Sequence, residues 1–295
     1  MADNTLENPY HSNINWYPGH MAKTRRMLSE NIRLVDCVIE ILDARIPLSS
    51  RNPNFDDIVT SKPRLVILNK SDLADSTVTD KWISFYKTKG ARVLLVSCQT
   101  GKGINKIIPE IFDLVKAKTE KYAKMGINKS IKIMIIGIPN VGKSTLINRL
   151  VGKAAAKTGD RPGVTLSKQW IRIRDDVELL DTPGILPPKL EDQTAALKLA
   201  STGAIRDDIM DTELIAYSLL EILRDKYPDL LKKRYNLSDI DALKGYELLE
   251  KIGRKRGCLV SGGEIDEFRA AAIVLDDFRS LKIGNISLDF TEDLQ

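Results

Sequence analysis

The sequence has few cysteines, few histidines and no long apolar run. Its three cysteines, Cys37, Cys98 and Cys258, are scattered and form no CxxC pair, which argues against a disulfide framework and a cysteine-based zinc site. No stretch of about 18 apolar residues is present, and residues 1–17 lack the basic and apolar regions of a secretory leader. We therefore expect a cytoplasmic protein that is neither exported nor membrane-bound.

The composition of the chain is that of a folded α/β protein. Its 295 residues are 43% hydrophobic and 29% charged, enough for one large domain and a smaller one. Four almost continuously apolar segments are typical of strands buried on both faces of a parallel sheet: residues 34–44, 64–70, 91–98 and 131–138. Residues 170–176 and 177–184 predict an antiparallel hairpin at one sheet edge. Residues 102–125 predict an amphipathic helix running into a basic connector.

Beyond Pro188 the pattern is helical only. The spacing predicts two apolar helix faces, Ile215, Leu219, Ile222 and Leu223 on one helix and Ile265, Phe268, Ala272 and Leu275 on the other. Gly284 is a suitable stop for the last helix. We expect one domain over 1–200, with an N-terminal arm, and a helical domain over 205–295, joined by an exposed linker.

The segment GIPNVGKST, residues 137–145, predicts a phosphate-binding loop between a strand and a helix. Gly137 and Gly142 allow the backbone amides to face phosphate at a helix N-terminus. Lys143 reaches the terminal phosphates, so we expect it to act in binding and in catalysis, and Ser144 is a magnesium ligand. The remaining members of the predicted nucleotide-binding loop are Asn140, Val141 and Thr145.

Two further motifs predict contacts to magnesium and the terminal phosphate. In DTPG, Asp181 would hold magnesium through water, and the Gly184 amide would meet the terminal phosphate. In RPGVT, Thr165 would complete the magnesium shell when a third phosphate is present. The alternative for Thr165 is an incidental threonine in a flexible Pro-Gly loop.

The motif NKSD predicts that the base is guanine. Asp72 can accept hydrogen bonds from N1 and N2 of guanine, which adenine cannot donate, while Asn69 and Lys70 support the loop and cover the ring. The backbone of Ser97, Cys98 and Gln99, at the end of the next predicted strand, would contact the base oxygen. The alternative is a plain surface turn, but two adjacent strand ends favour a site for GTP and GDP.

The order of these motifs is reversed relative to an ordinary GTPase, because the guanine motif precedes the phosphate loop. A chain opened before residue 34 and rejoined between about residues 125 and 131 forms the same sheet from a rotated sequence. We therefore predict an α/β fold: a circularly permuted P-loop GTPase domain, with a mostly parallel sheet and helices on both faces, followed by a smaller all-α domain.

Three additional segments, WYPGHM (16–21), DARIPLSSRNP (43–53) and residues 253–279, complete a resemblance that covers almost the whole chain. The sequence resembles the YlqF family of circularly permuted GTPases, the ribosome biogenesis GTPase A proteins. The resemblance implies a factor that docks on the maturing large ribosomal subunit and its rRNA and hydrolyses GTP at a late assembly step. We expect a monomer.

The predicted site lacks the usual water-positioning group. Ile185 follows DTPG where many GTPases have a glutamine, and isoleucine cannot orient water. His20, after an aromatic Pro-Gly turn, is the candidate, and the resemblance favours it; the alternative is that His20 anchors the following helix. In similar loops an asparagine at the place of Asn140 ligates potassium, whereas the alternative is loop stabilisation.

Two basic clusters in the predicted helical domain suit contacts with RNA phosphates. They are Lys232, Lys233 and Arg234, and Arg254, Lys255 and Arg256. The alternative is a pair of solvated helix ends. For the whole protein, the alternatives to a ribosome-linked GTPase are a GTP-regulated RNA-binding module with little catalysis and a small-molecule phosphotransferase. No acceptor site for the latter is visible.

Overall fold

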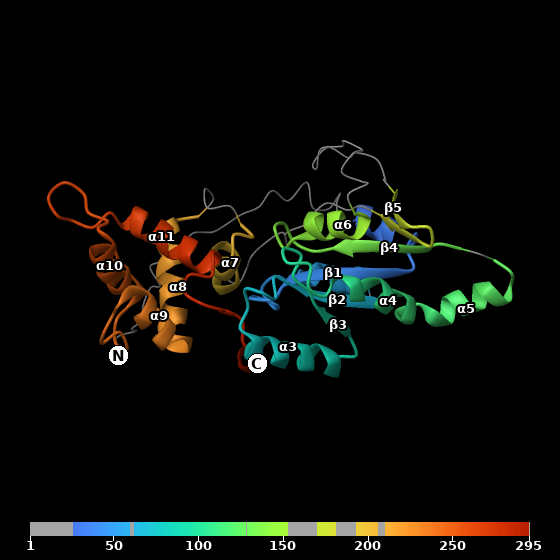
Figure 1. The fold of residues 1–295 in the computed structure, drawn as a ribbon, viewed down its shortest axis with the longest axis horizontal. Helices are drawn as coiled ribbons and strands as arrows, with labels where there is room; N and C mark the ends of the chain where they lie inside the picture. Colours follow the sequence, from blue (N-terminus) through green and yellow to red (C-terminus); the bar gives the residue numbers. More distant parts are fainter. Residues whose placement is uncertain are drawn as a thin grey trace, which may run out of the picture.

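The structure is a computed structural model. It describes residues 26–59, 62–127, 129–152, 170–180, 193–205 and 210–294. In these ranges six strands form one sheet in the spatial order β3-β2-β1-β4-β6-β5 (Figure 1). The strands are β1 (Cys37–Asp43), β2 (Arg64–Asn69), β3 (Arg92–Leu95), β4 (Ile131–Ile136), β5 (Trp170–Arg174) and β6 (Val177–Leu180).

The sheet is parallel except at one edge. Strand β1 pairs with β2 and β4, β2 pairs with β3, and β4 pairs with β6, all in parallel. Strand β5 runs antiparallel to β6. These pairings confirm the predicted parallel strands and the predicted edge hairpin. All residues of β1 are buried, which explains why its sequence is apolar without alternation.

Helices cover both faces of the sheet, because successive strand side chains point to opposite sides. Ile39 and Ile41 of β1 share a core cluster with residues of α4 (Ile104–Leu114) and α6 (Lys143–Val151). Leu42 belongs to a cluster with α3 (Ser76–Thr88), on the other face. Val38 belongs to a third cluster, with the helical residues 26–32 and with α2 (Asp56–Val59).

The segment over 102–125, predicted as an amphipathic helix running into a basic connector, consists of an amphipathic helix followed by a second, basic helix. After α4 the chain breaks at Val115 and continues as α5 (Lys116–Lys124), which has no buried residue. The apolar face of α4 therefore packs on the sheet, while the basic α5 leads to β4.

The helices of the second half lie together beside the sheet (Figure 1). They are α7 (Gln193–Ser201), α8 (Thr212–Lys226), α9 (Pro228–Tyr235), α10 (Gly245–Arg256) and α11 (Glu267–Arg279). Helix α7 precedes the predicted boundary at residue 205 but packs against α8 and α11. Among the described helices, none is long and apolar enough to cross a membrane.

The prediction for the last helix is wrong in its end and for two residues of its face, Phe268 and Ala272, whereas Leu275 is buried as predicted. Phe268 is 61% exposed and Ala272 is also exposed. The side chains of α11 that form its buried apolar face are Ala270, Ala271, Val274, Leu275 and Phe278. The helix ends at Arg279, so Gly284 lies in the following segment. The buried face is the one that meets α7, α8 and α10.

The C-terminal segment (residues 283–294) returns to the sheet half of the molecule. The indole Nε1 of Trp82, in α3, donates to the Asp289 carbonyl at 3.0 Å. The Asp289 carboxylate accepts from the Leu48 and Ser49 amides at 2.8 and 2.7 Å. It also pairs with Lys198 of α7 at 3.0 Å. The buried Asp289 carboxylate therefore joins the C-terminal segment both to the loop after β1 and to helix α7.

Candidate nucleotide-binding site

Four loops meet at the carboxyl edge of the parallel strands, where α/β sheets bind ligands. We name them the DAR loop (residues 43–50, after β1), the NKSD loop (69–75, after β2), the SCQ loop (97–99, after β3) and the P-loop (137–144, after β4). Because β1 lies between β2 and β4, the sheet order places the DAR loop between the NKSD loop and the P-loop.

Asn69 joins three parts of this edge. Its Nδ2 donates to the Val141 carbonyl of the P-loop at 2.7 Å, and its Oδ1 accepts from the Cys98 amide at 2.9 Å. The side chain is buried, so both bonds form away from water. Sequence reasoning assigned Asn69 a supporting role, and the structure identifies the two loops that it supports.

The SCQ loop is also fastened from α6. Arg149 donates through Nε to the Cys98 carbonyl at 3.0 Å and through Nη2 to the Gln99 carbonyl at 2.7 Å. Ser97 is buried, and its hydroxyl accepts from the Thr100 amide. Burial raises the pKa of the Cys98 thiol to about 11. Cys98 is therefore a neutral packing residue whose backbone is held in place.

The P-loop has the strand-loop-helix context that its motif requires. Gly142 precedes α6 with φ of 102°, and a Cβ there would lie 2.2 Å from Asn69 Nδ2. Glycine is therefore required by backbone conformation and by the close approach of Asn69. Helix α6 begins at Lys143, and Ser144 and Thr145 are exposed in its first turn. Amides of a helix N-terminus suit an anion at this position.

Lys70 has a partner that sequence reasoning missed. Its Nζ lies 2.9 Å from Asp43 Oδ2, and Arg45 donates to both oxygens of Asp43 at 3.0 and 2.8 Å. Burial alone would raise the pKa of Asp43, but Arg45 and Lys70 outweigh it and hold that pKa below its usual range. The signal in the sequence was DAR, directly after a buried strand.

Asp72 carries the observation that fits guanine. Its Oδ1 is shielded from solvent and has no hydrogen-bond partner among the residues that the structure describes. A buried carboxylate oxygen is unfavourable until donors reach it. The N1 and N2 groups of guanine are such donors, and adenine lacks them. The backbone of the loop is held at this residue, because Asn285 Nδ2 donates to the Asp72 carbonyl at 2.7 Å.

Asn140, the predicted potassium ligand, makes a contact of a different kind. It has φ of 60°, and its Nδ2 donates to the Gly203 carbonyl, in the turn after α7, at 3.1 Å. This bond fits the loop-stabilising alternative and links the P-loop to the helices. The potassium assignment remains a prediction.

Several predicted site residues lie outside the described ranges. They are His20, Thr165, Asp181 and Gly184, together with Ile185. Within the described part of the chain, no group of three or more histidine, cysteine or acidic side chains could hold a metal ion. The predicted magnesium set is therefore represented here by Ser144 alone.

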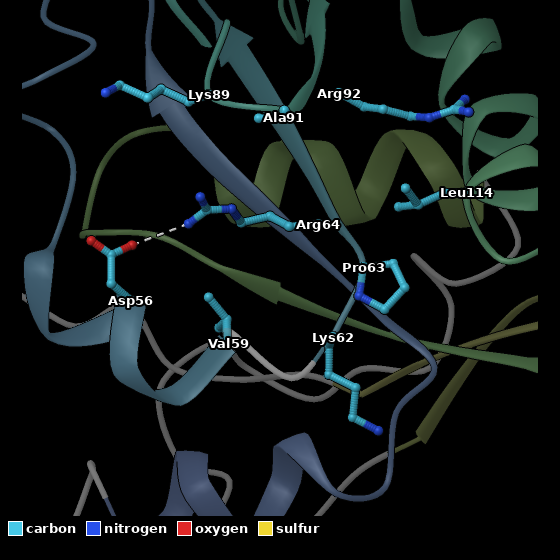
Figure 2. Close-up of a pocket in the computed structure, with 10 residues that line it drawn as sticks. Asp56, Val59, Lys62, Pro63, Arg64, Lys89, Ala91, Arg92 and Leu114 are labelled. Atoms are coloured by element: carbon cyan, nitrogen blue, oxygen red, sulfur yellow. Dashed lines mark hydrogen bonds and ion pairs between the residues drawn. The ribbon is translucent and has the colours of Figure 1, made fainter. Parts of the chain in front are cut away.

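A pocket of about 370 Å³ lies at the opposite edge of the sheet and does not form part of this site. It is lined by residues at the amino ends of β2 and β3, among them Arg64 and Arg92. Figure 2 shows Arg64 pointing toward Asp56, at 3.2 Å. Arg64 also pairs with Glu40, and Arg92 pairs with Glu110, so these cations are balanced by neighbouring carboxylates.

Comparisons with known proteins agree with this geometry. Residues 132–235 match a family described as 50S ribosome-binding GTPase, and the match begins in β4, the strand before the P-loop. The chain is 49% identical to ribosome biogenesis GTPase A of Bacillus cereus over 283 residues, 95% of each chain. It is 36% identical to mitochondrial ribosome-associated GTPase 1 of Mus musculus over 306 residues, 95% of this chain and 91% of that protein.

Solved structures give the same answer for the fold. The GNP-bound crystal structure of YlqF from T. maritima superposes with a TM-score of 0.65 at 28% identity, covering 92% of this chain and 99% of that one. A GDP-bound structure of YlqF gives a TM-score of 0.67 at 29% identity, covering 91% and 100%. The predicted circularly permuted P-loop fold is confirmed, and the chain belongs to the ribosome biogenesis GTPase A family and is a GTPase.

Proposed function

We propose that the protein binds GTP and GDP between its four loops and hydrolyses GTP on the maturing large ribosomal subunit to promote a late step of its assembly. The observation that carries the guanine assignment is the buried, unpartnered Asp72 Oδ1 beside loops joined by Asn69. The ribosomal part is supported by the names of the relatives, ribosome biogenesis GTPase A and 50S ribosome-binding GTPase. We place the protein in the cytoplasm as a monomer with a GTPase domain and a helical docking domain.

In this proposal each loop has one task. Lys143 and the amides at the start of α6 bind the phosphates, and Ser144 helps to hold magnesium, which would neutralise the charge between the two terminal phosphates. The further predicted magnesium and phosphate contacts are Thr165, Asp181 and the Gly184 amide. His20 orients the attacking water, and Asn140 is the position at which potassium would be tested.

The two basic clusters form a single surface. Some of its cations pair with a buried carboxylate, and the others are exposed. Arg234 donates to both oxygens of Asp277 at 2.9 and 2.8 Å, and Asp277 is buried. Arg256 lies 3.8 Å from the same carboxylate and 3.4 Å from the Arg234 carbonyl. These two arginines therefore hold α9, α10 and α11 together, in addition to any contact with RNA.

The cations on the outer side of this surface are better suited to phosphate. Lys233 is exposed, Arg254 pairs with Glu250 within its own helix, and Lys255 donates to the Asn236 carbonyl. Such exposed pairs are weak. We propose that Lys233, Arg254 and Lys255 contact rRNA phosphates in a salt-dependent way.

Phosphate release under multiple-turnover conditions, with and without isolated large subunits, tests the function. We expect turnover that rises when subunits are added and falls in Lys143→Ala and His20→Ala. Binding without turnover would favour the RNA-binding alternative instead.

Replacing Asp72 by asparagine, which presents a donor to the guanine donors, should weaken GDP binding and reduce base selectivity. Equal GDP affinity in both proteins would contradict the guanine assignment.

The docking surface is tested by replacing Lys233, Arg254 and Lys255 with alanine while keeping Arg234 and Arg256. Co-sedimentation with large subunits across a salt series should show weaker binding and a shallower salt slope. The matched control replaces Lys116, Lys121 and Lys124 of the exposed α5, which removes the same charge elsewhere. Equal loss in both triple variants would mean a general charge effect and no specific surface.

A further inference from the structure

We propose that residues 285–287 of the C-terminal segment form a clamp that positions the NKSD loop and thereby sets the preference for guanine. Asn285, Ser287 and Tyr227 are the positioning residues. The proposal rests on the proposed role of Asp72 in binding guanine.

Three consecutive residues of the clamp form hydrogen bonds with three positions of one loop, Asp72, Leu73 and Asp75. Asn285 Nδ2 donates to the Asp72 carbonyl at 2.7 Å, and the Ile286 amide donates to the Leu73 carbonyl at 3.2 Å. The Asp75 amide, at the N-cap of α3, donates to Ser287 Oγ at 3.2 Å. The loop is therefore held from Asp72 to the start of the next helix.

Asn285 of the clamp is exposed, whereas the residues that follow it are packed in the protein. Ile286, Ser287, Leu288 and Asp289 each have relative exposures of 2% or less. The Leu288 amide donates to the Arg45 carbonyl of the DAR loop at 2.7 Å. Burial and main-chain hydrogen bonds therefore hold residues 286–289 in one position against the loops.

Tyr227 anchors the clamp to the helices. Its hydroxyl donates to the Ser287 carbonyl at 3.2 Å and accepts from the Ser287 amide at 3.1 Å. Tyr227 is the C-cap residue that follows α8, and its ring lies 6.4 Å from that of Phe290. Ser287 is thus bonded both to the C-cap residue of α8 and to Asp75, the N-cap residue of α3.

The clamp matters for base preference because Asp72 is held mainly through its backbone. Asn69 joins the start of the loop to the P-loop and the SCQ loop, and the clamp bonds to the Asp72 carbonyl, while the Asp72 Oδ1 atom has no partner among the described residues. Hydrogen bonds weaken steeply with distance and angle. A small displacement of Asp72 should therefore weaken the bond to the exocyclic amine of guanine, which inosine nucleotides lack.

Competition titrations of GDP and IDP measure this effect directly. Asn285→Ala and Tyr227→Phe should lower the ratio of GDP to IDP affinity by about threefold to tenfold, the range expected when a positioning hydrogen bond is lost. Tyr227→Phe retains the ring that packs on Phe290, so it remains informative if Asn285→Ala folds poorly. The matched control is Glu292→Gln. Glu292 lies in the C-terminal segment but outside the clamp, and the substitution breaks its ion pair with Lys81 of α3. This control should leave the ratio unchanged.

Thermal unfolding and the Asp72→Asn variant separate the possible results. If the clamp only stabilises the fold, the variants lower Tm and both affinities equally, the ratio stays at its wild-type value, and the proposal is overturned. If Asp72→Asn abolishes the preference for GDP but the clamp variants keep it, only the clamp proposal fails. If Asp72→Asn keeps the preference, the assignment of Asp72 fails and the clamp proposal fails with it.

Discussion

Asn69 shows how a single buried amide can join two loops of the candidate nucleotide site. Its side-chain Nδ2 donates to a carbonyl of the P-loop, and its Oδ1 accepts from an amide of the SCQ loop. These partners lie 72 and 29 residues away along the chain. Truncation of this side chain leaves two buried backbone groups without their partners. The consequence should therefore appear in stability as well as in binding.

Asn69→Ala should lower the free energy of unfolding by about 2 to 6 kcal/mol, because two buried backbone groups lose their partners and each costs about 1 to 3 kcal/mol. Urea unfolding of the nucleotide-free protein measures the loss, and titration with GDP should show weaker binding. Asn69→Asp keeps the acceptor for the Cys98 amide but places a buried carboxylate oxygen against the Val141 carbonyl, so it should destabilise the protein at least as much as Asn69→Ala. A change below about 0.5 kcal/mol in Asn69→Ala would contradict this account.

The buried ion pair of Asp43 predicts a dependence of stability on pH. Because Arg45 and Lys70 lower its pKa in the folded state, the Asp43 contribution is present above the unfolded pKa of about 4 and is lost as pH falls below it. Asp43→Asn should destabilise the protein at pH 7 by about 3 kcal/mol, since two cations lose their partner. The difference from wild type should shrink between about pH 4 and pH 2. Urea unfolding as a function of pH checks this, and a difference that stays constant would refute the sign.

At the scale of elements, α11 shows what a helical pattern leaves open. The helix has apolar residues on more than one side, so its spacing alone did not decide which side is buried. The packing of α7, α8 and α10 decides it, and Val274 is buried while Phe268 is exposed. Val274→Ala should therefore cost about 1 to 3 kcal/mol in urea unfolding. Phe268→Ala, which removes the larger side chain, should change stability by less than about 0.5 kcal/mol. The reverse order would support the face predicted from the sequence.

The strands were predictable because each combines an apolar run of strand length with a polar motif at its end. That pattern located β1, β2 and β4 and placed the NKSD loop and P-loop at one edge. The bonds between these loops were not predictable, because Asn69 and Val141 are adjacent only after the sheet has formed. The return of residues 285–289 was also missed, since main-chain bonds to Leu73 and Arg45 leave no periodic pattern in the sequence.

At the scale of the whole molecule, the helices are joined to the loops of the candidate nucleotide site at three places. Asn140 of the P-loop donates to Gly203 after α7, and the clamp joins Tyr227 at the end of α8 to the NKSD loop. Arg45 adds a third bridge, since it donates to the Thr202 carbonyl at 3.3 Å and lies 5.4 Å from the Phe278 ring. If the protein binds a ribosomal particle as proposed, a change in the position of these helices would act directly on the loops of the candidate nucleotide site.

Such coupling must act in both directions. If the clamp strengthens GDP binding by a given factor, GDP must stabilise the clamped state by the same factor. Amide hydrogen exchange should therefore slow at residues 284–290 when GDP saturates the protein, because opening of this segment releases the Ile286 and Leu288 amides from Leu73 and Arg45. We expect about threefold to tenfold slowing, the same range as the affinity ratio. Tyr227→Phe should reduce the slowing, and the turn at 257–265, remote from the loops, should be unaffected. If P-loop amides slow on addition of GDP while those of 284–290 do not, the helices and the nucleotide are not coupled through this segment.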